Sequence, residues 1–166
     1  MSDKCNADGT PNVLYLEDVI NEKWGSGTAR VMCPITDPFP VHHGALGSFV
    51  RVHLLANKDK VAEIMEYCKS FPQVELILQD KEACEKFDLP LDREGDFVAV
   101  SIKHAVIGSC KDEHNLSNLD GHRLRSHGGI SEQGIPLLMS RPVKDGAETG
   151  SRQWRNFDAY DLVLNF

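Results

Sequence analysis

The sequence feature that most constrains the fold is an alternation of strand and helix patterns within residues 48–90. Apolar and polar residues alternate over residues 48–55, which is typical of a half-buried strand. Residues 57–71 follow with the spacing of an amphipathic helix, and residues 74–78 alternate again as a second strand. A short helical pattern over residues 80–87 completes the run. We therefore expect a compact β-α-β-α unit.

Capping and breaking residues mark the ends of these elements. Asn57 is a preferred residue for the start of the first helix, and Asp80 for the start of the second. Pro72 ends the first helix and Pro90 closes the unit, because proline cannot continue a helix. The buried stripe expected on the first helix consists of Val61, Ile64, Met65, Cys68 and Phe71.

Regular elements are expected on both sides of this unit. Apolar spacing predicts a helix over residues 16–24 that ends at Gly25, and residues 29–35 indicate a short strand. Residues 97–104 alternate as a further strand in which His104 shares the buried phase, as a core histidine. Because strands and helices alternate along the chain, the predicted fold class is α/β.

The C-terminal part has less periodicity. Residues 108–134 follow no regular period and contain three histidines, which in so long an irregular segment indicates a functional loop. Residues 135–140 form an apolar run that we expect to be a strand. Residues 157–164 have helical spacing and predict a C-terminal helix, after a polar connector over residues 141–152.

Composition excludes several classes of protein. The chain has 166 residues with 41% apolar and 26% charged residues, as expected of a soluble globular domain. Its net charge of -7 argues against a nucleic-acid partner or an anionic membrane surface. No apolar stretch approaches the roughly 20 residues of a membrane span, and the N-terminus does not resemble a signal peptide. We expect a cytoplasmic location.

The cysteines do not indicate a site. The five cysteines are odd in number, widely separated and never spaced as C-x-x-C, which argues against a disulfide framework and a zinc finger. Cys68 and Cys84 fall on apolar helix faces, where a small buried side chain is the expected role.

Seven histidines raise the question of a metal site. His42 and His43 are adjacent, so their side chains diverge in an extended loop and form only a weak signal. The sequence contains no H-E-x-x-H, phosphate-binding glycine loop or G-x-S-x-G motif. The more specific run is residues 125–129, Arg-Ser-His-Gly-Gly, because its two glycines allow close approach of the backbone. From the residues alone, a hydrogen-bonded structural role for His127 is favoured over metal ligation.

Several runs together carry a resemblance to a known family. Residues 124–133, followed by 135–138, resemble the C-terminal signature of the phosphonoacetate hydrolases of the alkaline phosphatase superfamily. Four further runs resemble the same family in the same order, so that the similarity extends from about Pro11 to Phe166; they are residues 34–38, 42–48, 95–101 and 156–161.

The resemblance implies an enzyme that cleaves the C–P bond of phosphonoacetate, giving acetate and phosphate. It implies two zinc ions, a threonine nucleophile and a small-molecule phosphonate as substrate. His127 stands where the family has a zinc ligand. We also expect a small α+β cap lobe over residues 48–90, because their alternating pattern lies between two proline-rich boundaries, and an incomplete alkaline-phosphatase-like α/β core made of residues 1–47 and 91–166.

The sequence also departs from the family pattern. The family's nucleophile and other zinc ligands lie in an N-terminal portion that has no counterpart here, and the two first residues, Met1 and Ser2, resemble the end of the family's Asp-His-Gly-Met run and the residue after it. One histidine cannot hold two zinc ions. We therefore expect no catalytic residue in this chain and no activity without that portion. None of the four threonines lies in the nucleophile's motif: Thr10, Thr28, Thr36 and Thr149.

Two functional hypotheses follow. In the first, the chain is the C-terminal portion of a zinc-dependent phosphonoacetate hydrolase, its partner is the missing N-terminal portion, and His127 contributes to the metal site. In the second, it is an inactive α/β fragment that acts as a binding or structural module. The sequence leaves open whether the chain forms a homo-oligomer and whether His42, His43 or Arg125 contact the site.

Overall fold

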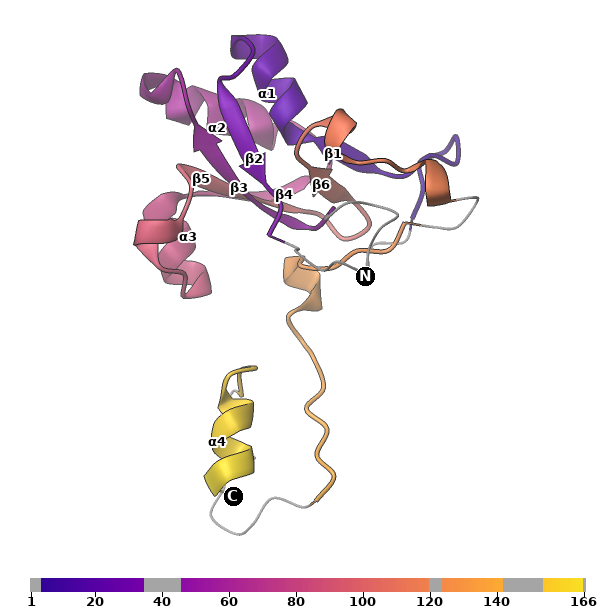
Figure 1. Ribbon diagram of the computed structural model, residues 1–166, viewed down its shortest axis with the longest axis vertical. Coiled ribbons are helices and arrows are strands. Elements are labelled where there is room, and N and C mark those ends of the chain that lie inside the picture. Colours follow the sequence, from indigo (N-terminus) through magenta and orange to yellow (C-terminus); the bar gives the residue numbers. More distant parts are fainter. Residues whose placement is uncertain (1–3, 35–45, 120–123, 142–153, 166) are drawn as a thin grey trace. The chain divides into compact units, whose positions relative to one another are not determined.

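The computed structural model describes residues 4–34, 46–119, 124–141 and 154–165 (Figure 1). The chain divides into two compact units, Met1–Gln133 and Gly134–Phe166. The described part of the first unit contains two sheets and three α-helices, and that of the second contains one α-helix. Mixed helices and sheets confirm the predicted α/β class.

The larger sheet of the first unit is antiparallel and has the strand order β2-β3-β5-β4. Its strands are β2 (Ala29–Met32), β3 (Phe49–Leu54), β5 (Phe97–Ser101) and β4 (Val74–Gln79). Strand β3 lies between β2 and β5, with Val52 opposite Val31 on one side and Phe97 on the other. The strands within residues 48–90 therefore share one sheet with β2 and β5, and the division into a core and a cap lobe stays a prediction.

Helices cover both faces of this sheet. Helices α1 (Leu16–Trp24) and α2 (Val61–Lys69) pack on the face that carries Val50, Val52 and Leu54 of β3. Helix α3 (Asp80–Phe87) packs against β4 and β5 (Figure 1). Its Phe87 ring meets the ring of Phe49 edge to face, with 5.7 Å between the ring centroids. Every residue of β5 is buried because this strand has neighbours on both faces and both edges.

A second, parallel sheet pairs β1 (Val13–Tyr15) with β6 (Val106–Gly108). Gly47 and Ile107 exchange backbone hydrogen bonds of 2.7 and 3.4 Å, so the segment before β3 lies along β6. Beside it is a small apolar cluster of Leu46, Val106, Leu119 and Leu124. The sequence did not predict β1 and β6, since three residues are too few to show a period.

Most elements predicted from the sequence are confirmed, with shifted ends. The helix over 16–24 ends at Gly25, which has a φ of 106°. Asn57 does not cap α2, because its backbone is left-handed and its amide instead donates to the Thr28 hydroxyl at 3.3 Å. The described 3₁₀ turns are Lys58–Lys60, Leu91–Arg93, Lys111–Glu113, Ser117–Leu119 and Ile130–Glu132.

Two predictions about strands are wrong. Strand β5 ends at Ser101, and His104 lies in a turn with a φ of 75°, because the chain reverses there to enter β6. Residues 135–140 are not a strand: Pro136 lacks a donor, Leu138 is 88% exposed, and no described strand pairs with them. The C-terminal helix is confirmed as α4 (Asp158–Asn165). No helix in the described part of the chain is long and apolar enough to cross a membrane.

Candidate functional site

The loop that carries His127 begins on buried side chains. Leu124 packs in the small apolar cluster with Leu46 and Val106. Two residues later, the buried Ser126 donates a hydrogen bond from its hydroxyl to the carbonyl oxygen of Leu46, at 2.5 Å. The start of the loop is therefore fixed to the segment that runs along β6.

The peptide group between His127 and Gly128 is hydrogen-bonded at both of its polar atoms. Its carbonyl oxygen accepts the backbone N–H of Ser48 at 2.9 Å. Its N–H donates to Oε2 of Glu132, also at 2.9 Å. Because the two partners come from different segments, this peptide is held in one orientation.

The two glycines of the loop have different roles. Gly128 has a φ of +103°, a conformation that residues with a side chain rarely adopt. A Cβ on Gly129 would lie 3.5 Å from Cβ of Ser48, which is an ordinary contact. Only Gly128 therefore needs to be glycine for this backbone path, whereas the sequence suggested a need for both.

The imidazole of His127 is exposed, and its ring makes no hydrogen bond within the described residues. The backbone around it is fixed while its ring nitrogens stay open to solvent. Such a side chain can take an external ligand without breaking a hydrogen bond to any residue that the structure describes.

Other residues singled out from the sequence lie elsewhere. His42, His43, Thr36 and Thr149 fall outside the described residues. Arg125 lies within the loop, between Leu124 and Ser126, and is exposed. His53 and His104 are partly buried, in β3 and in the turn before β6 respectively. The hydroxyl of Thr28 donates to the carbonyl of Trp24 at 3.2 Å, and that of Thr10 donates to Asp8 at 2.6 Å.

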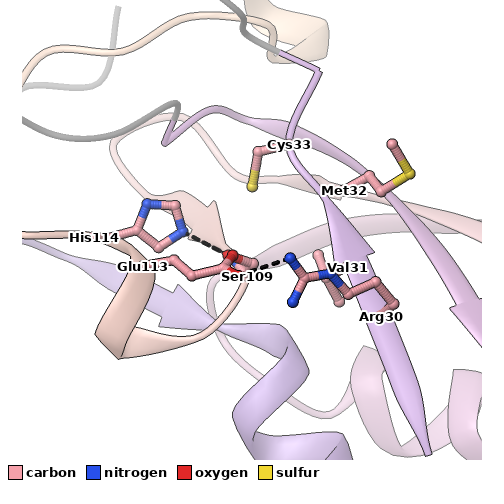
Figure 2. A pocket seen from close by; sticks show the side chains of 7 residues that line it. All are labelled: Arg30, Val31, Met32, Cys33, Ser109, Glu113 and His114. Carbon is pink, nitrogen blue, oxygen red and sulfur yellow. Dashed lines mark hydrogen bonds and ion pairs between the residues drawn. The ribbon is translucent and has the colours of Figure 1, made fainter. Parts of the chain in front are cut away.

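A pocket of about 360 Å³, lined by both polar and apolar side chains, lies between β2 and the segment that follows β6 (Figure 2). In Figure 2, Ser109 lies between the ring of His114 and the guanidinium of Arg30. The residues that line it are Arg30, Val31, Met32, Cys33, Ser109, Glu113 and His114.

Ser109 and His114 are joined through the backbone and the side chain. The backbone N–H of Ser109 donates to Nε2 of the buried His114 at 2.9 Å, so Nε2 is an acceptor. The Ser109 hydroxyl lies 2.9 Å from the same nitrogen and 2.6 Å from Oε2 of Glu113. Because Nε2 already accepts the backbone N–H, we infer that the Ser109 hydroxyl donates its hydrogen bond to the Glu113 carboxylate.

Glu113 connects this group to Arg30. The Ser109 hydroxyl and then the Arg30 guanidinium, at 2.7 Å, lower the pKa of Glu113 below its ordinary value. Arg30 also lies 3.3 Å from Glu17, whose other oxygen accepts the N–H of Val31 at 2.8 Å. These bonds tie β2 to α1 and to the turn after β6.

The pocket does not have the geometry of a nucleophilic site. In a serine–histidine–acid arrangement the carboxylate binds the histidine, whereas Glu113 binds the serine. Burial raises the pKa of the Cys33 thiol to about 11, so it is protonated at neutral pH. We assign these residues a structural role, for which no sequence motif gave a signal.

The chain is similar to known proteins of one family. No known protein-family profile matches the sequence. A phosphonoacetate hydrolase from Penicillium oxalicum is 51% identical over 53 residues, which are 31% of this chain and 74% of that protein. This chain belongs to the phosphonoacetate hydrolase family.

Solved structures of a phosphonoacetate hydrolase from Sinorhizobium meliloti 1021 agree with this assignment. The structure in complex with phosphonoformate has a TM-score of 0.69, and the one with phosphonoacetate a TM-score of 0.68. Both are 45% identical to this chain, and each match covers 78% of it and 31% of the solved chain. The chain thus spans less than a third of the solved enzyme and corresponds to its C-terminal portion.

The described residues can be compared with what zinc requires. A structural or catalytic zinc takes at least three protein ligands. No group of three or more His, Cys, Asp or Glu side chains able to hold a metal occurs among the residues that the structure describes. The described residues on their own therefore do not form a complete zinc site.

Proposed function

We propose that this chain supplies the C-terminal portion of a phosphonoacetate hydrolase and that His127 is one metal ligand of the active site. The reaction breaks the C–P bond of phosphonoacetate with one water. Phosphorus gains an oxygen to give phosphate, and the methylene carbon gains a proton to give acetate. The 45% identity to a solved hydrolase that holds phosphonoacetate supports this assignment.

The observation that carries the proposal is an exposed imidazole on a fixed loop. Ser126 is held by Leu46, and the peptide after His127 is held by Ser48 and Glu132. Ligands and other reactive groups work best when the surrounding structure fixes their position. The His127 loop provides that fixed position, and its ring has no competing partner within the described residues.

The chemistry that zinc would supply when bound in such a site is polarisation of the phosphonate oxygens and a lower pKa of an attacking hydroxyl. His127 would hold one coordination position through a ring nitrogen. We propose that the other ligands and the threonine nucleophile belong to the part of the enzyme that this chain does not cover.

The second candidate is a module without catalytic activity. Two observations favour it: the described residues hold no complete metal site, and the hydroxyls of Thr10 and Thr28 are both committed to local hydrogen bonds. In the part of the chain that the structure describes, neither threonine is hydrogen-bonded to the His127 loop. In this case the exposed loop would serve recognition rather than chemistry.

Complementation separates the two candidates. The chain is assayed for phosphate release from phosphonoacetate alone and after joining to the part of the Sinorhizobium meliloti enzyme that it does not match. We expect no release from the chain alone, even with added zinc, and zinc-dependent release from the joined protein. Turnover by the purified chain alone would show that its site is complete. A joined, folded protein without turnover would favour the inactive module.

A further inference from the structure

We propose that Glu132 is a positioning residue: its carboxylate fixes the peptide between His127 and Gly128 and so sets the direction of the His127 side chain. The effect of this positioning on metal binding rests on the proposed function. The carboxylate does not touch the imidazole in the contacts of the described residues, and it acts through the backbone.

The Gly128 backbone makes such a restraint necessary. Glycine populates positive and negative φ about equally, so its own preference does not select the observed φ of +103°. Hydrogen bonds must select it instead. The bond from Ser48 holds the carbonyl of the peptide, and the bond to Glu132 holds its N–H, both at 2.9 Å.

The 3₁₀ turn Ile130–Glu132 brings the carboxylate back to this N–H. The N–H of Glu132 donates to the carbonyl of Gly129 at 3.0 Å, which closes the turn beside the loop. A carboxylate that accepts a backbone N–H makes a charge-assisted bond, stronger than one between neutral groups. The Glu132 bond is therefore well suited to hold a flexible glycine peptide.

Glu132 is the partner that can be changed without disturbing the core. Its side chain is only partly buried, whereas Ser48 and Ser126 are buried at 4% and 2% exposure. Ser48 also acts through its backbone, which a substitution leaves in place. Substitutions of Glu132 thus test the restraint on His127 with little risk to the fold.

The test compares Glu132→Ala, Glu132→Gln and Glu132→Asp with the control Asp112→Ala, an exposed acidic residue of another 3₁₀ turn. Gln keeps an oxygen that can accept the bond. Asp keeps the charge but is one methylene shorter. We expect Ala and Asp to reduce the residual dipolar couplings of Gly128 N–H and His127 Cα–Hα and to speed exchange of the Gly128 amide about tenfold. Gln should lie between Ala and the wild type, because it keeps the acceptor oxygen but loses the charge. The control should resemble the wild type.

These measurements use the full chain without metal and therefore do not depend on the proposed function. Unchanged couplings in Glu132→Ala, or wild-type behaviour of Glu132→Asp, would overturn the proposal. Exchange at the buried Ile107 amide reports on folding, and if Glu132→Ala is unfolded, the comparison of Glu132→Asp with Glu132→Gln decides.

Zinc affinity of the joined enzyme is the second readout. Loss of a residue that orients a ligand typically costs tenfold to a hundredfold in metal affinity. We expect a loss of about tenfold in Glu132→Ala and partial recovery in Glu132→Gln. If His127→Ala leaves zinc affinity unchanged, the proposed function fails while the backbone result stands. If His127→Ala weakens zinc binding and Glu132→Ala does not, positioning by Glu132 is wrong.

Discussion

The hydroxyl of Ser126 and the carbonyl oxygen of Leu46 are joined by a 2.5 Å hydrogen bond across 80 residues of sequence. Both residues are buried, so neither group can exchange its partner readily for water. Gly47, next to Leu46, is hydrogen-bonded to Ile107 of β6. The position of the His127 loop therefore depends on the tertiary fold of the first unit.

Ser126→Ala should destabilise the protein. It removes the donor and leaves the buried Leu46 carbonyl without this bond, which costs about 1–3 kcal/mol in free energy of unfolding. The exposed Ser131→Ala is the matched control and should change stability by less than about 0.5 kcal/mol. Urea unfolding measures both values, and equal stabilities for the two variants would contradict the role of this bond.

Glu113 should make stability depend on pH. The Ser109 hydroxyl and the Arg30 guanidinium hold the pKa of Glu113 below its ordinary value of 4.5. A carboxyl with a lowered folded-state pKa stabilises the protein above the unfolded-state value, and that contribution is lost as pH falls through the folded-state pKa. Because the Glu113 side chain is 41% exposed, we expect it to contribute less than about 1 kcal/mol to the free energy of unfolding.

The check is the stability of wild type and Glu113→Gln from about pH 7 to about pH 3. The advantage of the wild type should be largest at neutral pH and should shrink below pH 4.5. Ser109→Ala should raise the Glu113 pKa, as read from its side-chain carboxyl carbon by NMR. A stability difference that is constant over the whole range would contradict the network in the pocket.

The cysteines should differ in reactivity. Burial raises the pKa of Cys33 to about 11 and that of Cys68 to about 12, and the thiolate is the reactive form. At neutral pH iodoacetamide should therefore modify the exposed Cys5 first and reach Cys33 and Cys68 only after denaturant is added. Mass spectrometry of peptides after timed labelling measures this order. Native Cys33 that reacts as fast as Cys5 would show that the pocket does not shield its thiol.

Sequence periodicity predicted the elements whose faces differ clearly in burial. Strand β3 alternates because Val50, Val52 and Leu54 face α1 and α2, and α2 carries a single apolar stripe. Periodicity gave wrong strands where the pattern continues beyond the sheet or has no sheet to join. The strand predicted over residues 97–104 ends before His104, which lies in a turn. Residues 135–140 are apolar, but no described strand pairs with them. Asn57 suits a helix cap by type, but its amide reaches Thr28 instead.

Of the candidate site, the sequence indicated only the central residues of the loop. The Ser-His-Gly-Gly run indicated His127, whose role as a ligand stays a prediction, and a glycine at position 128, which has a φ of +103°. The contacts that hold the loop could not be predicted, because Leu46 and Ser48 lie about 80 positions away and only the fold brings them near. The pair Ser109 and His114 belongs to no motif, and its geometry depends on the turn after β6.

The zinc content of the joined hydrolase with His127→Ala tests most directly whether His127 is a metal ligand. We expect less zinc per chain and less phosphate release from phosphonoacetate, because the variant lacks one ligand. His53→Ala, which replaces a partly buried histidine of β3, is the control and should keep both. Full zinc occupancy, measured by atomic emission, together with a full rate in His127→Ala would show that His127 is not a ligand.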